Sequence, residues 1–396
     1  MNPVYIAQRI NQLENESAFE VLSKAKALEA QGHSVVRLEI GQPDFKTPEN
    51  IINAAYNAMK GGFTGYTPTV GLPETRKAIA QYVTKYKNVP AEAENVIVVP
   101  GGKPIMFFAM LALINPGDEV IYPDPGFPIY RSCIKFAGGV PVPMPILEEN
   151  DFRADVEGLK ALVTDKTKMI IINNPANPTG GIFTKEDIKN IAEFLKDKDI
   201  FVLSDEVYDR IVFDDEIISI ASIPYMKDKT ILLDSFSKTY AMPGWRIGYG
   251  VANKDIINQI ELLMVNSNSC AAAFSQIAAI EALTGPQDKV TEMAAAFKQR
   301  ALYMAEALNG VKGISARKPR GAFYVFANIK ETGLTSKEYA ERLLYEGHVA
   351  ALAGTSFGGY GEGYIRFSCA NSLDKIKEAV KRIEKFNEKI LKEAHA

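Results

Sequence analysis

The sequence predicts an α/β fold, in which a large domain with a mostly parallel central sheet flanked by helices is joined to a smaller α+β domain formed by both chain ends. Short apolar runs rich in Val and Ile alternate with amphipathic stretches through the middle of the chain. This alternation is typical of buried parallel strands connected by helices. The chain's 396 residues also exceed the size at which a single hydrophobic core usually divides.

Six apolar runs in the middle of the chain are the expected strands of the large sheet. Each is short and apolar on both faces, as in a strand covered by helices on both sides. Amphipathic stretches such as Met106–Ile114 and Lys185–Lys196 are the expected helices between them. The expected strands are Val96–Val99, Glu119–Tyr122, Met169–Ile172, Phe201–Leu203, Ile231–Leu233 and Ile247–Val251.

The last third of the chain has a different pattern. A long helix is expected over Pro286–Leu308, then strands near Ala322–Ala327, His348–Leu352 and Tyr364–Ser368, and a charged helix from Ser372 to the end. At the N-terminus we expect a helix over Ser17–Ala30 and a strand over Val35–Ile40, packed against this last third. The expected parts are therefore residues 1–45 (N-terminal arm and part of the small domain), 46–285 (large domain) and 286–396 (small domain).

Composition excludes several classes of function. The net charge of −3 argues against nucleic-acid and anionic-membrane partners, which need a basic face. Three distant cysteines, no CxxC pair, and a start without the apolar core of a signal peptide favour a soluble cytoplasmic protein. The three histidines, His33, His348 and His395, show no metal-ligand spacing, so no metal is expected.

Polar or glycine-rich clusters follow four of the expected strands. Ligands gather at the carboxyl ends of strands in open α/β sheets, so four such clusters predict a binding site at this edge. They are Gly101-Gly102-Lys103, Asn173-Asn174-Pro-Ala-Asn177-Pro-Thr-Gly180, Ser204-Asp205-Glu206-Val-Tyr208 and Asp234-Ser235-Phe-Ser237-Lys238.

Each cluster also has a purely structural interpretation. Gly101-Gly102 fits a tight strand-to-helix turn as well as a phosphate site made of helix N-terminal amides. Asp205 fits a helix N-cap, and most lysines lie on the surface. Lys238, however, directly follows a buried strand, with Ser235 beside it. A buried lysine has a lowered pKa, which suits Schiff-base chemistry.

The segment Ser235-Phe-Ser237-Lys238-Thr-Tyr-Ala-Met-Pro-Gly-Trp245-Arg246-Ile-Gly248 resembles the cofactor-lysine signature of the class I/II aminotransferases, which are pyridoxal-phosphate enzymes of fold type I. The resemblance runs in the family's order from about residue 17 to the C-terminus. It implies an aminotransferase that moves an amino group between an L-amino acid and a 2-oxo acid with pyridoxal 5′-phosphate as cofactor. Further matching segments are Gly41-Gln-Pro-Asp44-Phe, Tyr66-Thr-Pro-Thr-Val-Gly71-Leu-Pro, Asn177-Pro-Thr-Gly and Ser204-Asp205-Glu206-Val-Tyr208.

The resemblance implies a role for each residue of the reacting centre. Lys238 would hold the cofactor covalently and then act as general base at the substrate's Cα. Asp205 would pair with the pyridinium nitrogen, so that the ring can accept electrons. Tyr208 and Asn177 would hydrogen-bond the phenolic oxygen.

The resemblance also implies a phosphate site shared between two subunits. Arg246 would clamp the phosphate with its planar fork, and Tyr66 would reach it from the neighbouring subunit, which implies a homodimer. Phe127 falls where the family stacks an aromatic ring, more often Tyr or Trp, on the cofactor; core packing is the alternative. The remaining phosphate contacts would come from Gly101, Gly102, Lys103, Ser235 and Ser237.

Substrate recognition is implied less specifically. Arg366 resembles the arginine that binds the substrate α-carboxylate, helped by Asn177 and the Gly41 backbone; a surface strand arginine is the alternative. Lys103 stands where some aspartate-using members bind the side-chain carboxylate, although Pro104 follows where they commonly have Gln. A solvated helix-start lysine fits equally. We expect aspartate with 2-oxoglutarate, with alanine or aromatic amino acids as the alternative.

Two other classes of enzyme share parts of these motifs. Ser235-x-x-Lys238 fits the nucleophile motif of penicillin-recognising hydrolases, but the Lys-Thr-Gly element that they also need is missing. A β-lyase of fold type I, or a regulator that has kept only the cofactor, would retain both Lys238 and Asp205. Ammonia release distinguishes the lyase from a transaminase.

Overall fold

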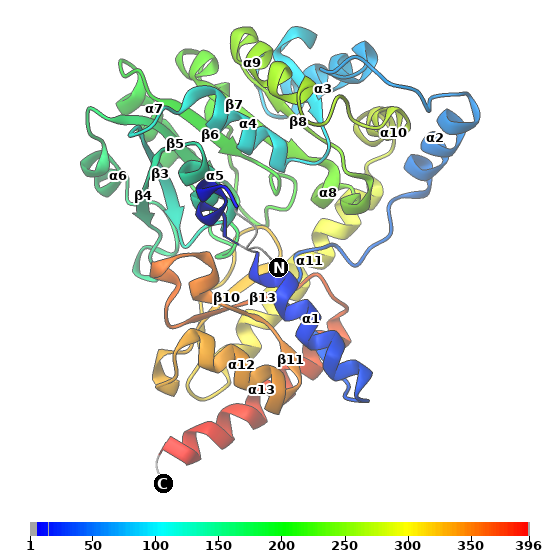
Figure 1. The fold of residues 1–396 in the computed structure, drawn as a ribbon. Helices are drawn as coiled ribbons and strands as arrows, with labels where there is room; N and C mark the ends of the chain where they lie inside the picture. The colour runs from blue at the N-terminus through cyan, green and yellow to red at the C-terminus, as the bar shows by residue number, and fades with distance from the viewer. Residues whose placement is uncertain (1–5, 15, 395–396) are drawn as a thin grey trace.

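The computed structural model describes residues 6–14 and 16–394. His395, considered above as a metal ligand, and the first five residues of the expected N-terminal arm lie outside them. A large part built around a broad sheet lies above a smaller part that contains the C-terminus (Figure 1). No helix among the described residues combines the length and the apolar character needed to cross a bilayer.

The central sheet has seven strands in the order β2-β8-β7-β6-β5-β3-β4. Only β8 runs against its neighbours, β2 and β7; the pairs from β7 to β4 are parallel, which confirms the mostly parallel sheet. The strands are β2 (Val96–Val99), β3 (Glu119–Asp124), β4 (Val140–Pro145), β5 (Thr167–Asn173), β6 (Phe201–Asp205), β7 (Thr230–Ser235) and β8 (Gly248–Val251).

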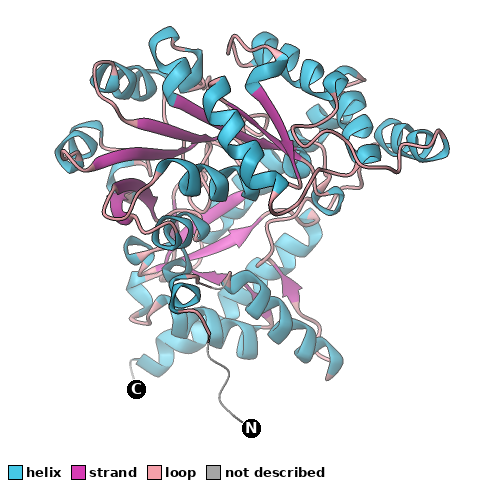
Figure 2. Ribbon diagram, turned by 45° about the horizontal axis from the view of Figure 1, so that its top comes forward, coloured by secondary structure: helices cyan, strands magenta, loops and turns pink. Residues whose placement is uncertain are grey.

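Helices cover both faces of this sheet (Figure 2). Alternate strand residues pack on opposite faces: Ile97 and Ile231 lie in one buried cluster with α4, α5 and α9, whereas Val98 and Leu232 lie in another with α2, α3 and α10. Helices α6 and α7 extend the second face. These helices are α2 (Glu49–Lys60), α3 (Pro73–Tyr86), α4 (Lys103–Leu113), α5 (Ile129–Phe136), α6 (Val156–Leu162), α7 (Lys185–Leu195), α9 (Lys254–Val265) and α10 (Ala273–Thr284).

The smaller part combines an antiparallel sheet, in the order β12-β13-β10-β9, with long helices. Its core contains residues of α11, α12 and α13 together with those of β10 and β13. The elements are α11 (Asp288–Asn309), β9 (Ser315–Ala316), β10 (Tyr324–Asn328), α12 (Ser336–Gly347), β11 (Val349–Ala350), β12 (Leu352–Ala353), β13 (Tyr364–Ser368) and α13 (Leu373–Ala394).

The N-terminal segment packs against the C-terminal part, as the sequence predicted. Strand β1 (Val36–Arg37) pairs in parallel with β11, and Val36 and Leu38 belong to the same buried core as α11–α13. Helix α1 (Ser17–Ala30) contributes Ala25 and Leu28 to a cluster with Ala350. The expected strand Val35–Ile40 is wrong in length, because only two of its residues form a ladder.

One strand of the large sheet was missing from the prediction. Strand β4 carries Pro141, Pro143 and Pro145, and proline is usually a sign against a strand. It lies at the sheet edge beside β3 alone, and Val140 donates its backbone N–H to Asp118. The alternate prolines therefore occupy positions whose missing N–H groups cost no ladder bonds.

Candidate active site

The carboxyl ends of the central strands meet at one edge of the large sheet. Asn173 ends β5 and Asp205 ends β6 as register partners. Ser235 ends β7 opposite Gly248 of β8, which in turn pairs with Val99 at the end of β2. Four clusters that lie far apart in sequence are thereby brought to the same edge, as predicted.

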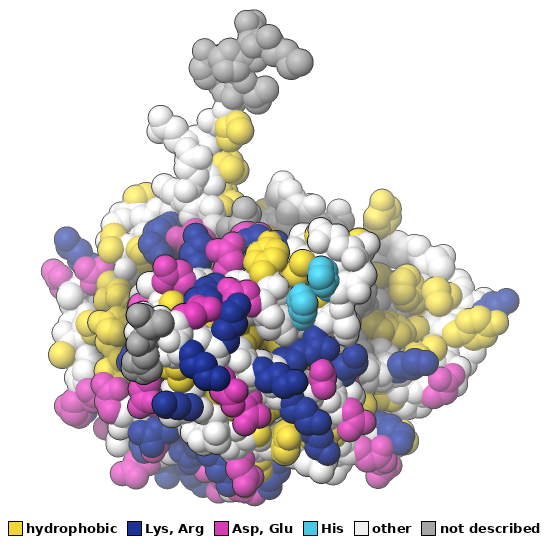
Figure 3. All heavy atoms as spheres, turned by 90° about the horizontal axis from the view of Figure 1, so that it is seen from below, with side chains coloured by type: hydrophobic (Ala, Val, Ile, Leu, Met, Phe, Trp, Pro, Cys, Tyr) yellow, Lys and Arg dark blue, Asp and Glu magenta, His cyan; other side chains and the backbone are white. Residues whose placement is uncertain are grey.

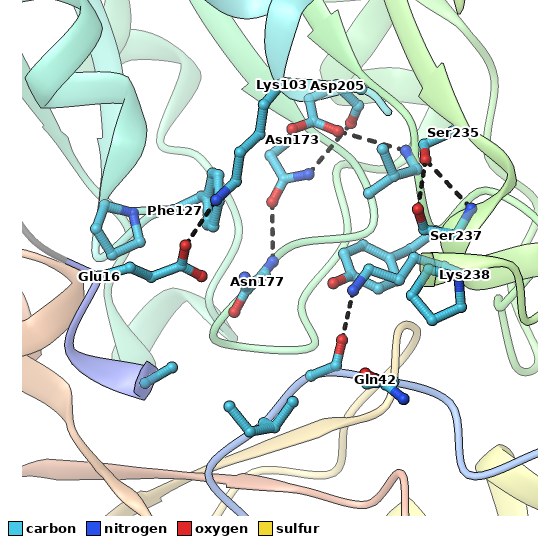
Figure 4. Close-up of a pocket in the computed structure, with 18 of the residues that line it drawn as sticks. Glu16, Gln42, Lys103, Phe127, Asn173, Asn177, Asp205, Ser235, Ser237 and Lys238 are labelled. Carbon is cyan, nitrogen blue, oxygen red and sulfur yellow. Dashed lines mark hydrogen bonds and ion pairs between the residues drawn. The ribbon is translucent and has the colours of Figure 1, made fainter. Parts of the chain in front are cut away.

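A cavity of about 520 Å³ lies at this edge. Twelve of the fourteen residues predicted for the site line it, and Figure 4 shows how several of them converge. They are Gly41, Gly102, Lys103, Phe127, Asn177, Asp205, Tyr208, Ser235, Ser237, Lys238, Arg246 and Arg366.

The other two predicted residues, Gly101 and Tyr66, do not line the cavity. Gly101 has φ +80°, and a Cβ there would lie 2.2 Å from the Arg246 guanidinium. It therefore supports the site through the close approach of Arg246, for which only glycine leaves room. The Tyr66 side chain is 95% exposed and reaches no site in its own chain.

Lys238 lies in α8 (Phe236–Thr239), the turn of helix that follows β7. Its Nζ donates a hydrogen bond to the Gly41 carbonyl, from the N-terminal segment of the chain. Burial, followed by the nearby Arg366 guanidinium, lowers the pKa of Lys238 to about 8. The surface interpretation of Lys238 is therefore wrong.

Asp205 is buried at the end of β6 and accepts a hydrogen bond from the Tyr130 hydroxyl at 2.7 Å. A turn follows Asp205 rather than a helix, so the N-cap alternative is wrong. Burial raises the pKa of Asp205 to about 6, although the Tyr130 hydroxyl opposes the shift. A cation placed beside this carboxylate would favour its charged form.

Two further hydrogen bonds fix the polar wall beside Asp205. The hydroxyls of Tyr208 and Tyr324 lie 2.8 Å apart. The Asn173 side-chain oxygen accepts the Asn177 backbone N–H at 2.9 Å. Asn177 is thereby held in the loop after β5 with its side chain toward the small domain.

Arg366 comes from β13 of the small domain and is only 4% exposed, so the surface-arginine alternative is wrong. One of its terminal nitrogens donates to Asn177 Oδ1 at 3.0 Å and the other to the Glu39 carbonyl at 2.5 Å. Its Nε is buried with no hydrogen-bond partner among the described residues. A guanidinium in this state suits an anionic ligand.

Gly41 lies where the N-terminal segment crosses the cavity. A Cβ at this position would lie 2.0 Å from the Tyr324 hydroxyl oxygen, so no larger residue fits without displacing that side chain. The close approach brings the Gly41 carbonyl within hydrogen-bonding reach of Lys238.

A second group of polar residues lies at the end of β7 and the start of α4, close to Lys238 in the cavity wall. The Ser235 and Ser237 hydroxyl oxygens are 2.9 Å apart, and Ser235 Oγ also accepts the Ser237 N–H at 3.2 Å. Arg246 lines the cavity, and one of its terminal nitrogens donates a hydrogen bond to the Pro243 carbonyl at 2.9 Å. Together with the Gly102 amide at the start of α4, these groups can hold a phosphate.

Lys103 begins α4, and its amine lies 2.6 Å from a carboxylate oxygen of Glu16. The amine also lies 5.4 Å from the centre of the Phe127 ring. The Phe127 ring packs edge-on against Tyr130 while lining the cavity. Lys103 is therefore paired rather than freely solvated.

Comparison with known proteins identifies the family. The model of the family described as "Aminotransferase class I and II" matches residues 33–383. The chain belongs to this family. It is an aminotransferase, and its fold is the aminotransferase fold.

Relatives of this aminotransferase have several names. The aspartate aminotransferase of Pyrococcus abyssi is 42% identical over 89% of this chain and 91% of its own. The solved aspartate aminotransferase from Thermus thermophilus with maleate is 32% identical, with a TM-score of 0.93 over 97% of this chain and 100% of its own. The solved aromatic aminotransferase from Pyrococcus horikoshii is 40% identical, with a TM-score of 0.88 over 93% and 99%.

Several cavity residues of this aminotransferase were not assigned to the site from the sequence. Asn173 lay within a segment already singled out, and Tyr130 follows three residues after Phe127, so their positions carried a signal. Tyr324 and Glu16 lay outside every motif. Their contacts depend on how the chain ends fold back onto the large sheet, which no local pattern reveals.

Proposed function

We propose that this aminotransferase binds pyridoxal 5′-phosphate in the cavity at the sheet edge, with Lys238 as its covalent attachment point. One observation carries the proposal: the Lys238 amine, the buried Asp205 carboxylate and the buried Arg366 guanidinium line the same cavity. When bound, this cofactor supplies an electron sink for the substrate's Cα.

The cavity's donors and acceptors suit the cofactor's different groups. Asp205 is the carboxylate that would pair with a protonated ring nitrogen. Burial raises the pKa of Asp205 in the free site, and a cation beside the carboxylate would offset this shift and favour its charged form. Tyr208 and Asn177 are donors for the phenolic oxygen, and Phe127 is the ring available for stacking. The phosphate would lie among the side chains of Ser235, Ser237 and Arg246, the residue Gly102 and the Lys103 amide, with Gly101 leaving room for the Arg246 guanidinium.

We propose that Lys238 removes the proton from the substrate's Cα. Its pKa of about 8 leaves a substantial neutral fraction near neutral pH, which a general base requires. Its present partner, the Gly41 carbonyl, is a neutral acceptor that a substrate can replace.

Arg366 is proposed to bind the substrate's α-carboxylate. Its Nε lacks a partner, and Asn177 and the Glu39 carbonyl fix the guanidinium plane. The Gly41 backbone and Asn177 complete this subsite. A bound carboxylate would thus be oriented with its Cα toward Lys238.

For the amino donor we propose aspartate, with 2-oxoglutarate as acceptor, and Lys103 as the cation that binds the side-chain carboxylate. The position of Lys103 on the cavity wall supports this role, as do the relatives named aspartate aminotransferase. Aromatic amino acids or alanine remain the alternative, because other relatives are named for those substrates.

The proposed active unit is a homodimer, in which Tyr66 of each subunit contacts the phosphate of the other. The 95% exposure of Tyr66 supports this arrangement. We further propose domain boundaries at residues 45 and 285, supported by the pairing of β1 with β11. A cytoplasmic location is supported by the free state of Cys133, Cys270 and Cys369.

Kinetics of three variants test this proposal. Lys238→Ala should abolish turnover and Asp205→Ala should lower kcat by at least about a hundredfold, where each tenfold is about 1.4 kcal/mol of barrier. Lys103→Ala should lower kcat/KM for aspartate. Transfer retained by Lys238→Ala would refute the assignment of the base, and an unchanged kcat/KM in Lys103→Ala would refute the dicarboxylate subsite.

A further inference from the structure

An ion pair between the N-terminal segment and α4 lies at the cavity wall. Glu16 is the N-cap residue of α1, and its carboxylate lies 2.6 Å from the Lys103 amine. Both residues line the cavity. Figure 4 shows the two side chains pointing toward each other, with Phe127 beside them.

Glu16 is paired with the Lys103 amine. The proposed function assigns this amine to the side-chain carboxylate of the substrate. No other ion pair or hydrogen bond of the Lys103 amine involves a described residue. Because Glu16 is itself a carboxylate on a short flexible stem, its interaction with Lys103 copies that of an aspartate or glutamate side chain. A dicarboxylic substrate and Glu16 therefore compete for one cation.

A second contact holds Glu16 in this position. Glu14 lies 3.2 Å from the Lys135 amine and 3.4 Å from the Arg131 guanidinium, both on α5. Its backbone N–H donates to Ser132 at 3.0 Å. Glu14 is thus tied to α5, and rotation of the Glu16 side chain is enough to release Lys103.

The Glu16–Lys103 ion pair is partly exposed to water, so a substrate carboxylate can replace Glu16. The Lys103 side chain is 48% exposed and that of Glu16 is 25% exposed, so water screens their attraction. A cation left without a partner beside an apolar substrate side chain would lose solvation with no compensating charge. Glu16 removes that penalty whenever no other carboxylate is present.

We propose that Glu16 sets the substrate range by substituting for the distal carboxylate on Lys103. With a neutral amino acid, Glu16 stays paired and keeps the subsite neutral. With a dicarboxylic substrate, Glu16 leaves and the substrate's own carboxylate takes Lys103. This inference rests on the proposed function, which places the distal carboxylate at Lys103.

Glu16→Gln tests the inference, because it removes the charge and keeps the shape. In the holoenzyme, this variant should bind maleate, an unreactive dicarboxylate, about two- to fivefold more tightly by titration calorimetry, as expected for loss of a partly exposed competing pair. In single-turnover half-reactions, the rate ratio for aspartate over phenylalanine should rise by a similar factor.

The matched control is Glu20→Gln, the same change on the same helix. Glu20 is 68% exposed and pairs with Lys24 on the outer surface of α1. It should leave the maleate affinity and the rate ratio unchanged. In a Lys103→Met background, Glu16→Gln should no longer tighten maleate binding, because there is no cation left to compete for.

Either of two results would overturn this inference without affecting the proposed function. One is a Glu16→Gln variant that matches Glu20→Gln in both measurements. The other is weaker maleate binding in Glu16→Gln, which would mean that Glu16 assists the dicarboxylate rather than competing with it. A wild-type protein that transfers amino groups but never from or to a dicarboxylate would instead refute the proposed substrate class, and this inference with it.

Discussion

At the scale of single residues, burial shifts two neighbouring groups in opposite directions. The pKa of Lys238 falls to about 8, while that of Asp205 rises to about 6. In both cases the charged form loses hydration that the site only partly replaces. Both groups therefore titrate near neutral pH, so a charged ligand bound beside them would alter their charge. Groups with perturbed pKa values of this kind cluster at functional sites.

The Lys238 amine is predicted to become reactive at a lower pH than other lysines. Trace labelling of the cofactor-free protein with acetic anhydride, quantified by mass spectrometry, should give half-maximal labelling of Lys238 near pH 8. Because burial disfavours the ammonium form, the proton leaves below the usual value of 10.5. A midpoint for Lys238 as high as that of the surface lysines in the same samples would contradict this prediction.

The same shift has a consequence for stability. Between about pH 8 and 10.5, the unfolded chain holds a proton on Lys238 that the folded chain has already lost. The unfolded state then binds more protons, so this amine makes the folded state gain stability as the pH rises through that window. Below pH 8 the buried ammonium group opposes folding.

At the scale of elements, the sequence predicted the strands that are apolar on both faces. β2, β13 and α1 were predicted residue for residue; in β2 the reason is that every residue is buried, which leaves an unbroken apolar run in the sequence. β4 was missed because alternate prolines mask an edge strand. β1 was overestimated because Leu38 and Ile40 continue the alternating apolar pattern beyond the two residues that pair in register with β11, although Leu38 still donates its N–H to Ala350.

The site residues, like the strands, were predictable where a local sequence pattern marks them. Residues directly after buried strands, such as Lys238 and Asp205, were predictable because strand ends meet at one sheet edge. Glu16 and Tyr324 were not, because their place in the cavity comes from packing against residues 87 and 116 positions away in sequence. Neither their residue type nor their spacing distinguishes them from ordinary helix and strand residues.

A buried ionic cluster supports the strand ends from behind. Lys87, at the end of α3, has a 4% exposed side chain, and its amine lies 3.1 Å from Glu206, 2.7 Å from Asp209 and 2.9 Å from Asp234. Glu206 and Asp234 adjoin two site residues in sequence, Asp205 and Ser235. Lys87 therefore joins α3 to the ends of β6 and β7.

Replacing Lys87 by methionine is predicted to lower the stability by about 3–5 kcal/mol, because two buried carboxylates and the largely buried Asp209 lose their shared cation. Urea unfolding followed by the fluorescence of the single tryptophan, Trp245, measures the change. Burial already raises the pKa of Asp234 to about 7, so the loss should shrink as the pH falls and carboxylates take up protons.

The control for this variant is Lys85→Met, on the exposed side of the same helix. It should change the stability by less than about 0.5 kcal/mol. A Lys87→Met protein as stable as this control at pH 8 would show that water or rearrangement satisfies the three carboxylates.

At the scale of the whole molecule, the charged side chains on the face seen in Figure 3 form no large patch of one sign. Basic and acidic side chains alternate over the face seen in Figure 3, in keeping with the net charge of −3. Apolar exposure is more informative. Helix α2 packs Ile51 and Ala55 inward but exposes a second apolar stripe, which points to a protein partner.

This stripe runs along α2 toward Tyr66, the residue proposed to cross between subunits. It consists of Ile52, Tyr56 and Met59, whose spacings of four and three residues place them on one side of the helix, and of Phe63 in the turn that follows; each is 37–53% exposed. In Figure 1, α2 lies at the margin of the large domain, far from the C-terminus. A second copy of the chain that covers the stripe would bring its own Tyr66 close to this interface.

Met59→Lys is therefore predicted to convert a dimer into monomers, because the new charge would be buried without a partner. Sedimentation velocity at micromolar concentration measures the association, and the variant should also bind pyridoxal phosphate more weakly, since it loses the partner's Tyr66. Tyr345→Lys, at a 46% exposed aromatic residue on α12, should stay dimeric with unchanged cofactor affinity. A wild-type monomer, or a Met59→Lys dimer that holds its cofactor as tightly as the wild type, would exclude α2 as the interface through which Tyr66 completes the site.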